Sequence, residues 1–340
     1  MYGKSRTRTF APLAASALIL AVLSTFAGCR SSRADSDPLP SWNDGAAKQA
    51  IVDFVREATT PGGAKFLTPD ARIATFDNDG TLWVEKPMYT QVTFAIDRVE
   101  ALAPQHPEWK EQPPLCAILE HDQAAIAKLT IQDIEKIIAA THSGMTTGEF
   151  EKIVDGWLGT NKHPRLKRRY TELVYEPMLE LMKYLRANGF KTYIATGGGQ
   201  DFVRVFSARV YGVVAEQVIG SAGKVKYEER NGKPVLVKLP EALLVDDKAG
   251  KPEAIHLIIG QRPSAAFGNS TGDQEMLEFA GGASSLEMLV HHDDADREYA
   301  YGPESKVGTF SDALRDEANQ RGWTIISMKR DWKRIFPFEH

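Results

Sequence analysis

Two aspartates that directly follow a buried strand constrain this sequence more than any other feature. The apolar run Ile73–Phe76 predicts a short strand, and Asp77 and Asp79 follow it in the run DNDGT at residues 77–81. Two carboxylates at this spacing are costly to remove from water without a counter-charge, which a bound divalent cation supplies. The pair therefore indicates a cation-dependent site, with Asp77 as the candidate nucleophile and Asp79 as the candidate general acid and base.

Two other predicted strands also end in polar turns. Apolar runs at residues 190–195 and 265–267 lead into TGGG at residues 196–199 and GNS at residues 268–270. Because short apolar strands alternate with helical patterns, we predict an α/β fold, a parallel sheet with helices on both faces. Ligands of such sheets bind at the carboxyl ends of the strands, so we expect the three turns to form one site.

The region between the first two turns has a different pattern. Apolar residues recur at helical spacing from about residue 89 to 169, with no alternating strand pattern. This predicts an all-α cap at residues 89–169, inserted into an α/β core formed by residues 45–88 and 170–340. Within that core, a hairpin is expected at residues 224–238 about an Asn-Gly turn.

The first thirty residues have the pattern of an export signal. Three basic residues within the first eight positions precede an apolar stretch at residues 10–27, and Cys29 follows. This is the layout of a secretory signal peptide, predicted here at residues 1–29. It resembles a bacterial lipoprotein signal, in which the cysteine becomes the lipidated N-terminus, except that Phe26 stands where such signals usually carry Leu.

The predicted location is outside the cytoplasm. We expect the protein to be exported and either periplasmic or membrane-anchored by lipid at Cys29, with residues 30–44, which are rich in Ser, Asp and Pro, as a flexible tether. Two alternatives stay open, which are ordinary cleavage with release of the chain, or an uncleaved N-terminal anchor.

The composition limits the partners. Hydrophobic residues make up 43% of the chain, charged residues 25%, and the formal net charge is −4. These are values of a soluble globular protein, and nothing in them favours nucleic acid or an anionic membrane surface. The expected partner is a small molecule, and membrane contact is expected only through a lipid at the N-terminus.

The polar turns match four motifs of the haloacid-dehalogenase-like hydrolase superfamily, in that superfamily's order. The first motif is DNDGT, the second is Thr196 at the end of an apolar strand, and the third is Lys251 ahead of a helix. The fourth is GNSTGD at residues 268–273. The chain resembles this superfamily from about residue 45 to at least 280, and the TGG turn and helical insertion are similar to its phosphoserine-phosphatase-like branch.

The resemblance implies a Rossmann-like three-layer core and a Mg²⁺-dependent phosphomonoester hydrolase. Asp77 would form an aspartyl-phosphate, and Asp79 would protonate the leaving oxygen and later activate water. The hydroxyl of Thr196, the backbone at Gly197 and the ammonium of Lys251 would bind the phosphoryl group. The substrate would be a small phosphorylated metabolite, and the cap would read its non-phosphate part.

The resemblance also implies the metal ligands. Mg²⁺ would be held by Asp77, by the backbone carbonyl of Asp79 and by the fourth motif, through Asn269 or Asp273. The phosphoserine-phosphatase-like branch has Asp where Asn269 stands. Asn ligates through its oxygen but carries no charge, so Asp273 is expected to take more of the charge of the metal, directly or through water.

Two other functions stay open. A carbon–halogen hydrolase of the superfamily shares the nucleophile but lacks the second aspartate, so Asp79 favours phosphate esters. A non-catalytic exported binding module on the same fold is disfavoured by the complete set of motifs, and only Asn269 keeps it open.

Three weaker features have an ordinary structural interpretation beside a functional one. Glu85 lies near the position where phosphoserine phosphatases bind a substrate ammonium, but its offset differs by one residue. The basic run at residues 162–169 is expected to be a solvated surface. The adjacent His291 and His292 point to opposite faces of a predicted strand, which disfavours a second metal site.

Overall fold

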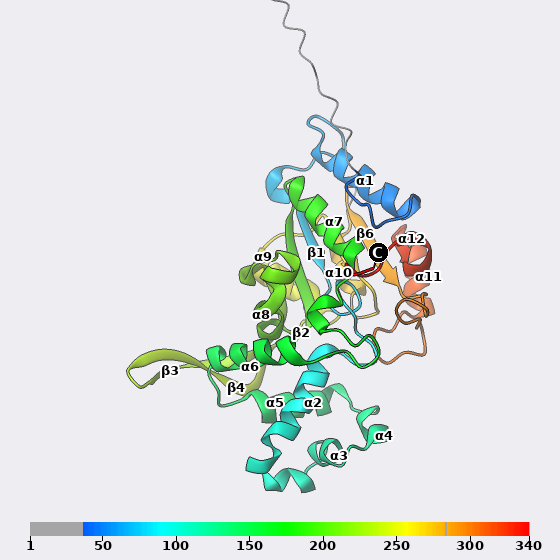
Figure 1. Cartoon of the computed structure of the whole chain (residues 1–340). Helices are drawn as coiled ribbons and strands as arrows, with labels where there is room; N and C mark the ends of the chain where they lie inside the picture. The colour runs from blue at the N-terminus through cyan, green and yellow to red at the C-terminus, as the bar shows by residue number, and fades with distance from the viewer. Residues whose placement is uncertain (1–36, 283, 340) are drawn as a thin grey trace, which may run out of the picture. The chain divides into compact units, whose positions relative to one another are not determined.

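The computed structural model describes residues 37–282 and 284–339. The strands are β1 (Ile73–Phe76), β2 (Lys191–Gly199), β3 (Val218–Arg230), β4 (Lys233–Leu244), β5 (Ala265–Gly268), β6 (Leu286–His291) and β7 (Thr324–Ser327). They form one seven-stranded sheet in the order β4-β3-β2-β1-β5-β6-β7, in which only the pair β3–β4 is antiparallel (Figure 1).

Helices follow most strands along the chain. The α-helices are α1 (Ala46–Thr59), α2 (Thr90–Leu102), α3 (Leu115–Leu119), α4 (Gln123–Ile126), α5 (Ile131–His142), α6 (Thr147–Thr160), α7 (Glu176–Ala187), α8 (Gln200–Tyr211), α9 (Gly250–Ile259), α10 (Gln274–Ala280), α11 (Asp312–Arg321) and α12 (Met328–Asp331). Short 3₁₀ turns lie at Pro69–Ala71, Ala103–Gln105, Pro107–Glu111, Tyr170–Glu172 and Ala215–Gln217. The α/β class predicted from the sequence is confirmed.

Strands β2, β3, β5 and β6 each contribute buried residues to two hydrophobic clusters, one on each face of the sheet. Successive side chains of a strand point to opposite faces, and in β5 Ala265 and Phe267 belong to one cluster whereas Ala266 belongs to the other. The first cluster includes the buried faces of α1, α7 and α8, and the second those of α9, α10 and α11. This gives three layers, helix, sheet and helix, as a Rossmann-like core requires.

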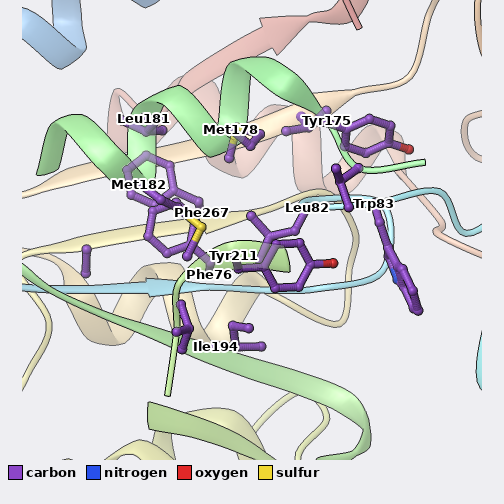
Figure 2. Packing of buried hydrophobic residues seen from close by; sticks show 14 of the residues in the cluster. Phe76, Leu82, Trp83, Tyr175, Met178, Leu181, Met182, Ile194, Tyr211 and Phe267 are labelled. Atoms are coloured by element: carbon purple, nitrogen blue, oxygen red, sulfur yellow. The ribbon is translucent and has the colours of Figure 1, made fainter. Parts of the chain in front are cut away.

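The first cluster packs directly under the predicted catalytic turn. The rings of Phe76 and Phe267 stack with their centroids 4.4 Å apart and their planes at 14°. Figure 2 shows Met178, Leu181 and Met182 of α7 against these rings. These side chains are fully buried and close-packed. They therefore hold the end of β1 in a fixed position beside the site.

The insertion between β1 and β2 contains α2 to α6 and has its own small core. A separate cluster joins buried residues of α2, α3, α4, α5 and a 3₁₀ turn: Ala95, Val99, Trp109, Leu115, Ile118, Ile126 and Ile137. Helix α6 instead buries Phe150, Val154 and Leu158 in the first cluster. The segment joining α5 to α6 also pairs with β4, since Gly144 N donates to Lys238 O and Lys238 N to Met145 O, each at 2.9 Å.

Strands β2, β3 and β4 are longer than the sequence predicted, and β4 ends at Leu244 instead of Lys238. Strand β2 continues through the glycine run to Gly199, with a register shift between Thr196 and Gly199. The hairpin predicted at residues 224–238 begins at Val218, because the start of β3 pairs in parallel with β2. Pairing with a neighbouring strand therefore extends segments whose glycines alone indicate a turn.

Part of the predicted tether packs on the core. Leu39 and Trp42 are buried, and the Trp42 indole nitrogen donates to Pro177 O at 3.0 Å, so residues 37–44 pack on the core instead of forming a flexible link. Residues 1–29 lie outside the described residues, so the signal peptide and the lipidation at Cys29 stay predictions. Within the described ranges, none of the helices combines the length and the apolar character needed to cross a bilayer.

The packing of α7 leads to a stability prediction. Leu181 is fully buried, so Leu181→Ala should lower the free energy of unfolding by about 2–5 kcal/mol through lost contacts and a cavity. Leu257 on α9 is 74% exposed, and Leu257→Ala should change it by less than about 0.5 kcal/mol. Denaturant titration of both variants measures the difference, and equal losses would contradict the description of the core.

Candidate active site

The DNDGT run forms a tight loop at the carboxyl end of β1. Asp77 N makes the last sheet hydrogen bond, to Phe267 O at 2.8 Å, and Leu82 N then donates to Asn78 O at 2.8 Å. Gly80 has a φ of +79°, and a Cβ there would lie 2.1 Å from the amide nitrogen of Asn269. Glycine is therefore required at this position by both the backbone angle and the available space.

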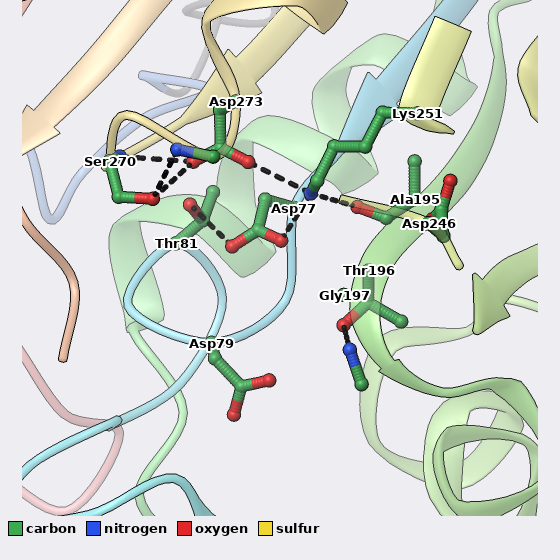
Figure 3. Close-up of polar contacts among 12 residues, drawn as sticks. Asp77, Asp79, Thr81, Ala195, Thr196, Gly197, Asp246, Lys251, Ser270 and Asp273 are labelled. Atoms are coloured by element: carbon green, nitrogen blue, oxygen red, sulfur yellow. Dashed lines mark hydrogen bonds and ion pairs between the residues drawn. The ribbon is translucent and has the colours of Figure 1, made fainter. Parts of the chain in front are cut away.

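Lys251 joins the ends of three segments through one ammonium group. Its Nζ lies 2.7 Å from Asp77 Oδ1, 2.8 Å from Asp273 Oδ1 and 2.7 Å from Ala195 O (Figure 3). The contacts with Asp77 and Ala195 are hydrogen bonds, and the contact with Asp273 is an ion pair. Lys251, Asp77 and Asp273 are 2%, 6% and 1% exposed. Burial opposes the charged form, but the Asp273 and Asp77 carboxylates outweigh it and raise the pKa of Lys251 above its usual value.

Asp79 is held by an indole and points away from the Lys251 cluster. The Nε1–H of Trp83 donates to Asp79 Oδ1 at 2.9 Å, and the Trp83 ring stacks on Phe206 at 4.7 Å. Burial raises the pKa of Asp79 to about 6, although the hydrogen bond from Trp83 opposes the rise. A carboxyl group with a pKa near neutrality suits both donation and acceptance of a proton.

The glycine turn at the end of β2 faces Asp79. Thr196 is fully buried and its hydroxyl accepts from Gly198 N at 3.1 Å, whereas Gly197 is exposed. Gln91, in the first turn of α2, reaches this turn and accepts from Gly199 N at 2.6 Å. The structure thus places the predicted phosphate-binding residues opposite Asp77 and Asp79 (Figure 3), and adds a cap residue that the sequence did not reveal.

The fourth motif surrounds the other side of Asp77. Asp273 Oδ2 accepts from the backbone nitrogens of Asn269 at 2.9 Å and Ser270 at 3.0 Å. The Thr81 hydroxyl lies 3.2 Å from Asn269 Oδ1 and 3.4 Å from Asp77 Oδ2. Both carboxylate oxygens of Asp273 therefore have partners. Asp77 Oδ2 and Asn269 Oδ1, in contrast, both face the Thr81 hydroxyl, at distances typical of weak hydrogen bonds.

This convergence fits a small, oxygen-ligated cation. Mg²⁺ prefers carboxylate, carbonyl and amide oxygens, and Asp77 Oδ2 and Asn269 Oδ1 are two such atoms within reach of one hydroxyl. Within residues 37–282 and 284–339, no cluster of three or more His, Cys, Asp or Glu side chains could hold a metal ion. The candidate site has a different composition, with one carboxylate, one amide and one backbone carbonyl.

Glu85 occupies a different place from the one its sequence position suggested. It is buried, and its Oε1 accepts from Asn269 Nδ2 at 2.7 Å and from the hydroxyl of Tyr301 at 2.6 Å. Its accepting oxygen is directed at the fourth motif, through Asn269. Tyr301 was not identified from the sequence, because it lies 216 residues away and belongs to no motif.

The two adjacent histidines contact different partners. His292 is buried, with Nε2 2.8 Å from Gly80 O and Nδ1 3.1 Å from Glu298 Oε2. His291 is partly exposed and lies 3.3 Å from a guanidinium nitrogen of Arg315. The two rings thus have separate partners, as their adjacency on a strand predicted.

The basic run at residues 162–169 makes local surface contacts. Arg165 lies over the ring of Tyr299, with its guanidinium carbon 4.5 Å from the ring centroid, and Arg168 lies 3.9 Å from that of Phe338. These contacts agree with the interpretation of the run as a surface feature.

Asp246 is a buried acid beside the site that sequence patterns did not reveal. It is fully buried between β4 and α9, next to Thr196 in Figure 3, and neither carboxylate oxygen has a hydrogen-bond partner among the described residues. Burial raises its pKa to about 7, against the lowering effect of the Lys251 cation. An acid without partners carries no sequence signal, since neither periodicity nor spacing marks it.

The chain belongs to a known enzyme family. Residues 74–278, more than half of the sequence, match the family of haloacid dehalogenase-like hydrolases. The protein is therefore a hydrolase of this family, which confirms the superfamily recognised in the sequence. Among curated proteins, no sequence matches the chain.

Several solved structures are similar. A conserved, functionally unknown protein from Anaerococcus prevotii has 16% sequence identity and a TM-score of 0.52, with 83% of this chain and 91% of that chain covered. A protein of unknown function from Bordetella pertussis has 16% identity and a TM-score of 0.46, with 75% and 97% covered. A phosphoserine phosphohydrolase-like protein from Francisella tularensis has 13% identity and a TM-score of 0.39, with 76% and 95% covered. The first of these supports the fold alone.

Asp246 gives the site a measurable pH dependence. The fold raises the pKa of Asp246 from 3.8 to about 7, so between these pH values the unfolded state ionises more readily than the native state. The free energy of unfolding therefore falls as pH rises through this range. Asp246→Asn should therefore stabilise the protein more at pH 8 than at pH 5, by roughly 2–3 kcal/mol. Denaturant titration at both pH values tests this. The exposed Asp70→Asn is the control, and a pH-independent effect of Asp246→Asn would contradict the burial argument.

Proposed function

We propose that the protein is a Mg²⁺-dependent phosphatase that hydrolyses a small phosphomonoester through an aspartyl-phosphate on Asp77. The observation that carries this proposal is Asp79. A halide leaves without a proton, whereas an alkoxide leaving from phosphorus needs one. A half-buried carboxyl with a pKa of about 6, two residues after the nucleophile and opposite the Thr196 turn, supplies that proton.

The first half-reaction forms a bond between Asp77 and phosphorus. A carboxylate oxygen of Asp77 attacks, the bond from phosphorus to the ester oxygen breaks, and the protonated Asp79 transfers its proton to that oxygen. Thr196, Gly197 and Lys251 hold the phosphoryl oxygens during the transfer. Lys251 already lies 2.7 Å from Asp77 Oδ1, so it also keeps the nucleophile in one orientation.

The second half-reaction releases phosphate. Asp79, now a carboxylate, accepts a proton from a water molecule as the water oxygen attacks phosphorus. The bond between phosphorus and the Asp77 oxygen then breaks, which returns Asp77 to the carboxylate and Asp79 to the acid. Trp83 donates its hydrogen bond only to Oδ1 of Asp79. The other oxygen, Oδ2, is therefore available for both proton transfers.

The metal would be held by Asp77, the Asp79 backbone carbonyl and Asn269. In this proposal Asp273 stabilises the site and does not ligate the metal, because both its oxygens have other partners. When bound, Mg²⁺ neutralises the negative charge of the nucleophile and of the phosphoryl group. The chain's own residues align the reacting atoms and move the protons.

The proposal is tested by phosphate release from a panel of phosphomonoesters. Asp77→Asn should reduce kcat by at least about a thousandfold, because the nucleophile is lost. Asp79→Asn should reduce it by about 10²–10⁴-fold on alkyl phosphates. With 4-nitrophenyl phosphate, whose leaving group needs no proton, the release of 4-nitrophenol in the first turnover should be slowed much less, whereas the second half-reaction still needs Asp79. Chelation of Mg²⁺ should abolish turnover.

The exposed Asp70→Asn, with the same chemical change outside the site, should retain full activity. A folded wild-type protein with no turnover on any ester would argue against the phosphatase and favour a binding module. Turnover of haloacids in place of phosphate esters would favour the carbon–halogen hydrolase.

We propose further that the chain is exported and lipidated at Cys29. The N-terminal basic residues, apolar stretch and cysteine support this. Cells that express the protein and are fed labelled palmitate should incorporate label into the wild type but not into Cys29→Ser. Cys116→Ser, the matched control at the other cysteine, should be labelled as the wild type is. Unlabelled wild-type protein would contradict lipidation.

A further inference from the structure

The amide of Asn269 has a fixed orientation in the site. Its nitrogen donates to Glu85 Oε1 at 2.7 Å, and its oxygen accepts from the hydroxyl of Thr81 at 3.2 Å. The same hydroxyl contacts Asp77 Oδ2 at 3.4 Å, so the amide oxygen faces the nucleophile. Glu85 and Asn269 are 2% and 1% exposed, and solvent does not compete for either contact.

We propose that Glu85 is a positioning residue, which holds Asn269 so that the amide oxygen, and not the nitrogen, faces a divalent cation at Asp77. This inference rests on the proposed function, since it takes the site to bind Mg²⁺. Glu85 acts through Asn269 and does not itself ligate the cation.

The need for such a residue follows from the chemistry of an amide. The two ends of an asparagine side chain have nearly the same size, but only the oxygen can ligate a cation. If Asn269 flipped, its oxygen would face Glu85 Oε1, and two acceptors would meet where a 2.7 Å hydrogen bond now exists. A buried acceptor without its donor is unfavourable, so Glu85 excludes the flipped amide.

The acceptor is itself fixed. Glu85 Oε1 accepts a second hydrogen bond from Tyr301 at 2.6 Å, and an oxygen that accepts two hydrogen bonds carries no proton, whichever state the carboxyl group has. The ring of Tyr301 stacks on His292 at 4.4 Å and 23°. Gly308 approaches so closely that a Cβ there would lie 1.8 Å from Glu85 Oε1, so the carboxyl group has little room to move.

The experiment measures Mg²⁺ binding to the purified protein by titration calorimetry, without substrate. Glu85→Met removes the acceptor at similar length and should weaken Mg²⁺ binding about tenfold or more. Glu85→Gln keeps an oxygen that can accept from Asn269 and should stay within about threefold of the wild type. Glu229→Met, on an exposed part of the hairpin, is the matched control and should bind as the wild type does.

A double variant distinguishes the loss of amide orientation from general damage to the structure. Asp presents an oxygen in either rotation, so adding Asn269→Asp to Glu85→Met should restore most of the lost affinity. Three results would overturn the inference: unchanged Mg²⁺ binding in Glu85→Met, Glu85→Gln as weak as Glu85→Met, or no recovery in the double variant. Any of these with a wild type that binds Mg²⁺ leaves the proposed function intact, whereas a wild type that binds none removes both.

A second variant covers the case in which Glu85→Met does not fold. Asn269→Asp alone keeps Glu85 and replaces the donating amide nitrogen with an acceptor, so the metal-free protein should melt about 2–5 °C below the wild type. Unchanged melting would show that no hydrogen bond between Asn269 and Glu85 exists, and would overturn the inference.

Discussion

The ammonium group of Lys251 holds the site together. It reaches from the start of α9 to the carboxylates of Asp77 and Asp273 and to the carbonyl of Ala195, so one cation connects the ends of β1 and β2 with the turn before α10. Two buried carboxylates so close together would repel each other without it. Asp77, β2 and the fourth motif are therefore joined through a single side chain.

The main chain of the site could be predicted from the sequence because it follows from a general rule of parallel sheets. Short apolar runs such as Ile73–Phe76 are strands that are buried on both faces, and the polar turns after them meet at one edge of the sheet. The structure brings Asp77, Lys251 and Asp273 into direct contact at this edge. Neither the metal ligands nor the catalytic roles follow from this contact, and both stay proposals.

Contacts between distant side chains were beyond sequence analysis. Glu85 and Tyr301 meet across 216 residues, and Tyr301 lies outside the residues that match the family and belongs to no motif. Trp42 was assigned to a tether because Ser, Asp and Pro surround it, but its ring packs edge-on against Trp332 at the other end of the chain. In both cases the contact is set by tertiary packing, and the composition of the neighbouring sequence does not indicate the partner residue.

The close approach of Gly308 to Glu85 has an evolutionary consequence. A side chain at position 308 and a glutamate at position 85 cannot occupy the same space, and Glu85 in turn suits an amide, not a carboxylate, at position 269. A lineage that exchanged Asn269 for aspartate would have to change position 85 as well. The steric limit at position 308 would then be relieved, although its φ of +63° would still favour glycine. These three positions, which lie far apart in the chain, can be expected to change together or not at all among the descendants of this protein.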